Sequence, residues 1–132
     1  MAFKKLLLLV LIIPLICILV FLGFVLTYPT YGEFVVLNNS DEDLSRVTLL
    51  VDKRSFEIDD LPKNGKQKVR FKIGSESSLA IKAITKSGKL ISGENFVYVD
   101  GAFDTSATIC IRSSAIEVQN LKLSAWWRPE KD

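Results

Sequence analysis

Histidine is absent from this chain of 132 residues, and cysteine occurs only twice. The absence of histidine removes the usual general base, the usual partner of a catalytic nucleophile and the commonest metal ligand. The sequence also has no glycine-rich phosphate loop, Walker motif or serine-centred elbow. We therefore expect a protein that is not an enzyme, with no cofactor and no metal ion.

The two cysteines, Cys17 and Cys110, lie in different surroundings. Cys17 is inside a long apolar run, whereas Cys110 stands between Ile109 and Ile111 in a predicted strand. If the apolar run crosses a membrane, the two thiols cannot pair within one chain, so we expect no internal disulfide. No neighbour in the sequence would lower the pKa of the Cys110 thiol, which predicts a packed rather than a reactive cysteine.

An excess of one sign of charge is also missing. Lys4 and Lys5 account for the whole net charge of +2, so the rest of the chain carries equal numbers of basic and acidic residues. A balanced domain has no general attraction to polyanions. We therefore expect no nucleic-acid partner.

The most prominent feature present is an uncharged, mostly aliphatic run from Leu6 to Leu26. An α-helix of this length spans about 32 Å, which matches a hydrocarbon core of about 30 Å. Pro14 lies inside the run, where a membrane helix tolerates it. Lys4 and Lys5 precede the run and no basic residue follows until Arg46. This charge bias predicts a cytoplasmic N-terminus and an extracytoplasmic C-terminal domain.

A cleaved signal peptide is the alternative interpretation of the same segment. Its apolar core usually has about 7–15 residues, which is shorter than this run. The best cleavage site, Thr30-Tyr31-Gly32, matches the small-residue pattern poorly, and Tyr28 and Tyr31 suit an aromatic belt at a membrane surface. We predict a basic leader at 1–5, a transmembrane signal anchor at 6–26, a linker at 27–32, an extracytoplasmic domain at 33–120 and a tail at 121–132. The alternative gives a secreted domain after cleavage near Gly32.

Beyond the linker, apolar and polar residues alternate with a period of two, and no window shows a helical stripe. The predicted strands are 33–37, 46–51, 56–58, 66–73, 79–83, 96–99 (or 90–99), 108–112 and 115–119. In the strand at 66–73, Val69, Phe71 and Ile73 are expected to face inward. About seven or eight short strands separated by turn residues predict an all-β, antiparallel sandwich.

The first half of this domain resembles bacterial immunoglobulin-like modules. The matching residues are Val36-Leu37-Asn38-Asn39-Ser40, Leu44, Val47-Thr48-Leu49, Ile58, Leu61-Pro62-Lys63-Asn64-Gly65 and Val69-Arg70-Phe71. The whole chain also looks similar to small bacterial single-pass membrane proteins of unknown role that carry one such domain. The resemblance implies an immunoglobulin-like β-sandwich after one transmembrane helix, and it implies no activity.

Four polar residues alternate like the start of a calcium-binding loop: Asn39, Asp41, Asp43 and Ser45. The glycine that such a loop requires is replaced by Leu44, and its bidentate glutamate is replaced by Leu50. We therefore interpret this segment as a solvated turn.

Every second residue between positions 66 and 72 is basic. These four residues, called the basic row below, are Lys66, Lys68, Arg70 and Lys72. On a strand they share one face at intervals of about 7 Å. The face is either solvated and guarding a sheet edge, paired with acids such as Glu57 and Asp59, or placed against an anionic surface.

Aromatic residues near the C-terminus supply a second candidate contact site. Trp126, Trp127 and Arg128 could close the sandwich, sit at a membrane surface or dock a partner, and Phe103 lies in a predicted loop. We expect a non-enzymatic, membrane-anchored sandwich that acts by contact, as an accessory or assembly subunit of a cell-envelope complex with a protein partner. The alternative is a binding module for lipid headgroups or wall polymer that uses the basic row. Oligomeric state stays open at this stage.

Overall fold

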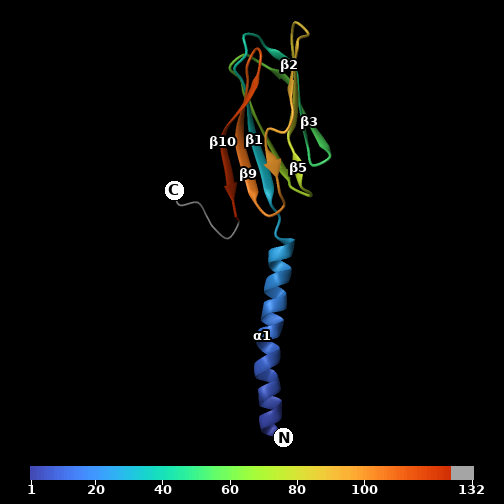
Figure 1. The fold of residues 1–132 in the computed structure, drawn as a ribbon, viewed down its shortest axis with the longest axis vertical. Helices are drawn as coiled ribbons and strands as arrows, with labels where there is room; N and C mark the ends of the chain where they lie inside the picture. The colour runs from blue at the N-terminus through green and yellow to red at the C-terminus, as the bar shows by residue number, and fades with distance from the viewer. Residues whose placement is uncertain (126–132) are drawn as a thin grey trace.

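The computed structural model describes residues 1–125, as one long helix followed by two packed β-sheets (Figure 1). Helix α1 (Ala2–Thr27) runs through Pro14, and residues 3–24 are all exposed. It is long and apolar enough to cross a membrane, a property that signal sequences near an N-terminus share. The predicted apolar span at 6–26 therefore lies within a helix that also includes most of the basic leader.

The strands form two sheets of four strands and one short pair. The first sheet contains β1 (Tyr31–Asn38), β4 (Lys66–Lys72), β9 (Asp104–Ile111) and β10 (Ile116–Ser124), in the order β10-β9-β1-β4. The second sheet contains β2 (Leu44–Val51), β3 (Arg54–Leu61), β6 (Ala80–Thr85) and β7 (Leu90–Gly93), in the order β3-β2-β6-β7. The short pair contains β5 (Ser77–Ser78) and β8 (Tyr98–Val99). The prediction of an all-β sandwich after an apolar helix is confirmed at this level.

The prediction of a wholly antiparallel sandwich is wrong for one pair of strands. β1 lies between β4 and β9, and it pairs with β9 in parallel, with Phe34 opposite Ala107. Alternation of apolar residues fixes which face of a strand is buried, but it carries no information about the direction of the neighbour.

Several predicted boundaries also move. The first strand begins at Tyr31 rather than 33, and β10 continues to Ser124, four residues into the predicted tail. β9 begins at Asp104, inside a predicted loop, and the segment 90–99 divides into β7 and β8. The strand predicted at 115–119 is the first part of β10; its continuation to Ser124 was missed because a register shift between Gln119 and Lys122 interrupts the alternation of apolar residues.

Aromatic packing at one end of β1 and β4 illustrates how the core forms. Phe71 is 5% exposed, and its ring centroid lies 5.7 Å from that of Phe34 and 5.2 Å from that of Phe56. Gly32 lies under the same ring, where an added Cβ would come within 2.4 Å of it. The predicted inward face of this strand is confirmed, because Phe71 and Ile73 are buried and Val69 packs against the core.

The connection between helix and sheets is short and is bonded into the sandwich. Only Tyr28, Pro29 and Thr30 separate α1 from β1. Thr30 is 3% exposed; its hydroxyl donates to the Gly101 carbonyl at 2.9 Å, and its carbonyl accepts from Ile73 N at 2.8 Å. The predicted linker at 27–32 is therefore partly helix, partly strand and partly a buried junction.

Candidate interaction surface

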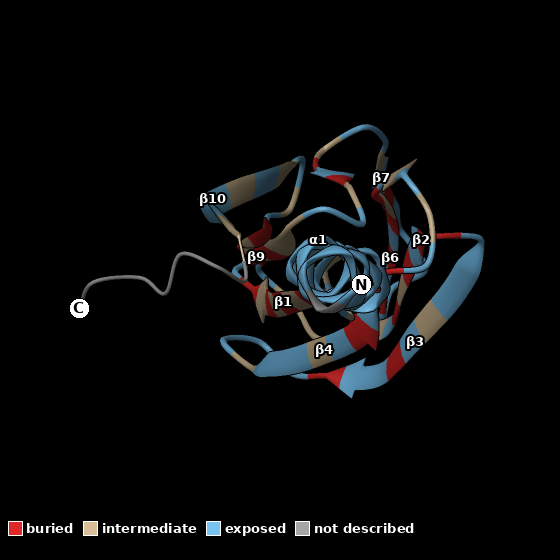
Figure 2. Cartoon of the chain, turned by 90° about the horizontal axis from the view of Figure 1, so that it is seen from below, coloured by how far each residue is buried: buried red, intermediate tan, exposed pale blue. Residues whose placement is uncertain are grey.

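The basic row lies on an outer strand of the first sheet. β4 pairs with β1 along one side only, and all four basic residues are exposed. β3 holds the corresponding outer position in the second sheet. Seen along the helix, β3 and β4 lie beside each other on the same side of the molecule, and both are largely exposed (Figure 2). Two free sheet edges therefore meet on one side of the sandwich.

The two edges carry opposite charge on their outward faces. On β3 the outward residues include Glu57 and Asp59, whereas β4 presents the basic row. Among the described residues, no member of the basic row forms an ion pair with either acid. Of the sequence-based alternatives, pairing of the row with these two acids is therefore not found.

The basic row does have partial support from its own sheet. Lys68 Nζ lies 3.0 Å from Glu33 Oε1, and the Arg70 guanidinium lies 4.7 Å from the centre of the Tyr31 ring. Both contacts are diagonal, between β4 and the neighbouring β1. Within the described residues, Lys66 and Lys72 form no ion pair, so the row remains a solvated cationic face.

A groove, called the edge groove below, separates β3 from β4. It has a volume of about 630 Å³ and is lined by residues 55–59 and 67–70. Phe56 and Val69, which are partly buried, contribute apolar surface to it. The turn at 62–65 closes one end of the groove, and Arg54 closes the other by donating to the Lys72 carbonyl. The groove thus lies between two strands that are joined at both ends.

Arg54 is held in that position by a buried carboxylate. Asp52, 8% exposed, accepts hydrogen bonds from the Ser75 hydroxyl, from Gly74 N at 2.8 Å and from Arg54 at 2.6 Å. The Ser75 and Gly74 hydrogen bonds, followed by Arg54, lower the pKa of Asp52 to about 2. Arg54 also lies over the Phe56 and Phe71 rings, at 5.7 and 5.4 Å.

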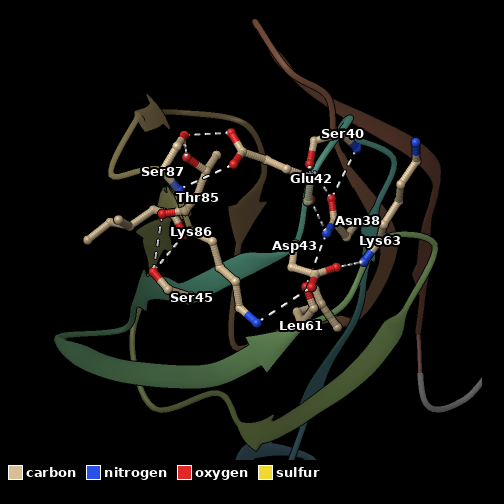
Figure 3. A network of polar contacts seen from close by, with 11 residues as sticks. Asn38, Ser40, Glu42, Asp43, Ser45, Leu61, Lys63, Thr85, Lys86 and Ser87 are labelled. Carbon is tan, nitrogen blue, oxygen red and sulfur yellow. Dashed lines mark hydrogen bonds and ion pairs between the residues drawn. The ribbon is translucent and has the colours of Figure 1, made fainter.

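A second polar cluster, the far-end network, lies at the end of the sandwich opposite α1 (Figure 3). At its centre is Asn38, which is fully buried. Its amide nitrogen donates to the Glu42 and Leu61 carbonyls at 3.0 and 3.1 Å, and its amide oxygen accepts from Ser40 N and Oγ at 3.0 and 2.6 Å. One side chain therefore holds two turns together.

The acids of the far-end network hold further turns in place. Glu42 accepts from Ser87 N at 3.2 Å and from its hydroxyl at 2.8 Å, and the hydroxyl bond lowers the pKa of Glu42. Asp43 accepts from Lys63 N at 2.8 Å, which lowers the pKa of Asp43, and lies 3.6 Å from Lys86 Nζ. Of the two carboxylates in the calcium-like pattern, Asp43 thus bonds to the turn at 62–65 and Asp41 to Ser113, so they are directed at different turns.

The other predicted side chains are distributed over the molecule. Asp41 bonds to Ser113, away from Asp43, and within residues 1–125 no group of three potential ligands is placed to hold a metal ion. Cys110 is 1% exposed, and burial raises the pKa of its thiol. Phe103 is partly buried in the turn before β9. Trp126, Trp127 and Arg128 lie outside the described residues.

Sequence reasoning did not identify the edge groove or the apolar part of β10. Leu121 and Leu123 on β10 are 50% and 59% exposed. Their spacing of two residues was a signal, but it fell in a segment predicted as tail. The groove had no sequence signal, because it depends on which strands lie at the edges of the two sheets.

Comparisons with known proteins give structural resemblances over part of the chain but no family. No family model matches the chain, and no curated protein sequence matches it. A protein from Eubacterium rectale solved by NMR shares 14% identity, with 70% of this chain and 88% of that one aligned and a TM-score of 0.45. Wild-type pneumolysin shares 10% identity over 72% of this chain and 23% of that one, with a TM-score of 0.38.

A further similar structure is a disulfide-locked mutant of intermedilysin with human CD59. It shares 10% identity over 71% of this chain and 24% of that one, with a TM-score of 0.36. This chain thus spans about a quarter of the length of pneumolysin and of intermedilysin. None of these similarities assigns a function.

Proposed function

We propose that this protein is a non-enzymatic, membrane-anchored contact module of the cell envelope, in which α1 spans the membrane and an immunoglobulin-like sandwich stands outside the cytoplasm. The observation that carries the proposal is the pair of exposed, oppositely charged sheet edges beside an open groove. Free strand edges bind other polypeptides through backbone hydrogen bonds, and side chains next to them select the partner. The role is that of an accessory or assembly subunit of an envelope complex.

The junction after α1 supports anchoring over cleavage. Cleavage near Gly32 would remove Thr30 and Tyr31, which bond to Gly101, Ile73 and Asp104. The released domain would start inside β1 and lose those contacts. Sequencing the N-terminus of the mature protein distinguishes the two cases, since a start at Glu33 would establish a secreted sandwich instead.

Co-purification tests the contact function directly. The full-length chain is extracted from membranes with a mild detergent, and stoichiometric partners are identified by mass spectrometry. A chain in which Lys68→Glu and Arg70→Glu alter the edge should lose its partner while keeping its fold. Recovery of the same partner with both chains would contradict a role for this edge.

The basic row favours a second candidate, binding of an anionic envelope ligand. The row runs the length of β4, from Lys72 opposite Tyr31 near α1 to Lys66 opposite Leu37 at the far end. It therefore extends along the long axis of the sandwich, with only Lys72 at the end next to α1, and this favours an extended wall polymer over the headgroups of the same bilayer.

Retention on immobilised wall polymer, compared with anionic vesicles, tests this candidate. Binding through the row should weaken as added salt shortens the Debye length from about 10 Å at 0.1 M, and the Lys68→Glu, Arg70→Glu chain should bind less. Equal retention of the two chains on both materials would eliminate the anionic ligand.

A further inference from the structure

The four edge strands of the two sheets differ in length and regularity. β10 has a register shift between Gln119 and Lys122, and β7 has only four residues, so both are poor templates for a further strand. β3 and β4 have eight and seven residues. The longer edge strands of the described chain without a shift of register are therefore the two that flank the edge groove, although Asp60 near the end of β3 has a positive φ of 53°.

Charge prevents either of these edges from pairing with its own copy. A β4 strand beside a second β4 would bring basic rows together, and a β3 strand beside a second β3 would do the same with Glu57 and Asp59. Like charges opposite each other destabilise a strand pair, whereas opposite charges stabilise it. The favourable combination is β4 of one copy with β3 of another.

The positions of the charges along the two strands fit this combination. Arg54 reaches the Lys72 carbonyl at one end, and the turn at 62–65 joins Leu61 to Lys66 at the other. Counting inward from the turn places Glu57 and Asp59 within about one residue of the levels of Arg70 and Lys68, because the positive φ of Asp60 (53°) interrupts the alternation of β3. All four of these residues line the edge groove.

We propose that the protein forms a two-fold symmetric dimer in which β4 of each copy pairs antiparallel with β3 of the other across the edge groove. The two-fold axis is parallel to the strands, so each residue and its equivalent in the second copy lie at the same height along the axis. Glu57 then faces Arg70 of the second copy, and Asp59 faces Lys68. Each four-stranded sheet continues into the opposite sheet of the second copy, and both free edges are closed together.

Two further features agree with this arrangement. Phe56 and Val69, which are left partly exposed beside the groove, would be covered by the same residues of the second copy. A two-fold axis parallel to the strands also makes both α1 helices extend in the same direction, because α1 leaves the sandwich at the start of β1 (Figure 1). This last point rests on the proposed membrane anchor; the charge argument does not.

Charge exchange between two variants of the full-length chain tests the dimer. The acid-edge variant carries Lys68→Glu and Arg70→Glu, and the base-edge variant carries Glu57→Lys and Asp59→Lys. Mass in detergent micelles is measured by light scattering or sedimentation, and circular dichroism confirms that each variant is folded. We expect the wild type to be dimeric and each variant alone to dissociate, with a dissociation constant at least about tenfold higher.

Mixing the two variants is the decisive step. When an acid-edge copy meets a base-edge copy, opposite charges face each other at both β4–β3 pairs. The two variants should form a heterodimer, and the chain with all four substitutions should be a homodimer again. A Lys82→Glu, Lys122→Glu chain, which changes as much charge on β6 and β10, away from these edges, should stay dimeric.

Three results would overturn the proposal: a monomeric wild-type chain, variants that remain dimeric alone, or variants that fail to associate when mixed. These outcomes are separate from those of the co-purification experiment. A different protein partner could bind a monomer, and a dimer could form without one.

Discussion

The far-end network and the β3–β4 edge both collect charged and polar side chains, but they direct them differently. In the network, Asn38, Glu42 and Asp43 point into neighbouring turns and accept or donate bonds there. At the edge, Glu57 and the basic row are exposed, and within the described residues only Lys68 of these five forms an ion pair, with the half-exposed Glu33. The comparison separates polar groups that define the structure from polar groups that remain available to a second molecule.

Phe71→Ala should have the largest effect, because Phe71 lies on the inward side of the strand whose outward side carries the basic row. Loss of the ring from the core should lower the free energy of unfolding by about 3–5 kcal/mol. Urea denaturation of the 28–132 fragment measures it. The neighbouring outward Lys72→Ala should change it by less than about 0.5 kcal/mol, and a similar cost for both would refute the assigned faces.

Removal of the junction should come next. A fragment 33–132 lacks the Thr30 and Tyr31 bonds to Gly101, Ile73 and Asp104, which a fragment 28–132 retains. The shorter fragment also loses the strand pairing of Tyr31 and Gly32 with β4 and β9. At about 1 kcal/mol per lost hydrogen bond, it should be less stable by at least about 3 kcal/mol. Equal midpoints in urea would show that the junction contributes nothing to the sandwich.

Asn38→Ala tests the far-end network itself. The substitution removes the Asn38 donor from the Leu61 and Glu42 carbonyls and the Asn38 acceptor from Ser40 N, while the Glu42 carbonyl keeps its bond from the Ser40 hydroxyl. A loss of about 2–3 kcal/mol is expected. Asn39→Ala is the matched control, since the Asn39 side chain is exposed and the backbone bond from Asn39 to Ile111 is kept. If both variants unfold at the same urea concentration, the network is not the structural element proposed.

Asp52→Asn should have a smaller effect that depends on pH. The pKa of Asp52 falls from 3.8 to about 2 in the folded chain, so its carboxylate stabilises the fold above pH 4 and this contribution disappears as pH falls through 2. The variant should be less stable than wild type by about 1–2 kcal/mol at pH 7. Urea titrations at pH 7, 3 and 2 should show the difference in unfolding free energy between wild type and variant shrinking. A difference that does not change with pH would contradict the lowered pKa of Asp52.

Lys68→Ala should have the smallest effect. The Lys68–Glu33 pair has side chains that are 60% and 38% exposed, so water and salt weaken it. A double-mutant cycle with Glu33→Ala should give a coupling energy below about 1 kcal/mol. A larger value would mean that the basic row belongs to the fold, as the far-end network does.

Sequence patterns predicted the parts of this molecule that depend on local alternation and length. The apolar run became α1, and Val69, Phe71 and Ile73 face the core as expected. The parallel pairing of β1 with β9 was missed because direction depends on how the chain returns over a long distance.

The candidate surface was predictable only in part, for a similar reason. The basic row is visible in the sequence, because its residues follow one another at a fixed spacing. Its relation to Glu57 and Asp59 is not visible, since it depends on the sheet order that places β3 and β4 at neighbouring edges. The burial of Asn38 was not predicted either, because an asparagine followed by Asn39 and Ser40 is typical of an exposed turn.

The bonded junction at Thr30 has a mechanical consequence. With only three residues between α1 and β1, and with Thr30 fixed to Gly101 and Ile73, little backbone is left to act as a swivel. A change in the tilt of the helix would therefore reorient the sandwich as a lever arm, with the greatest displacement at the end beside Asn38 and Glu42. Any tilt imposed on α1 by its surroundings would thus set the direction in which the charged edges face.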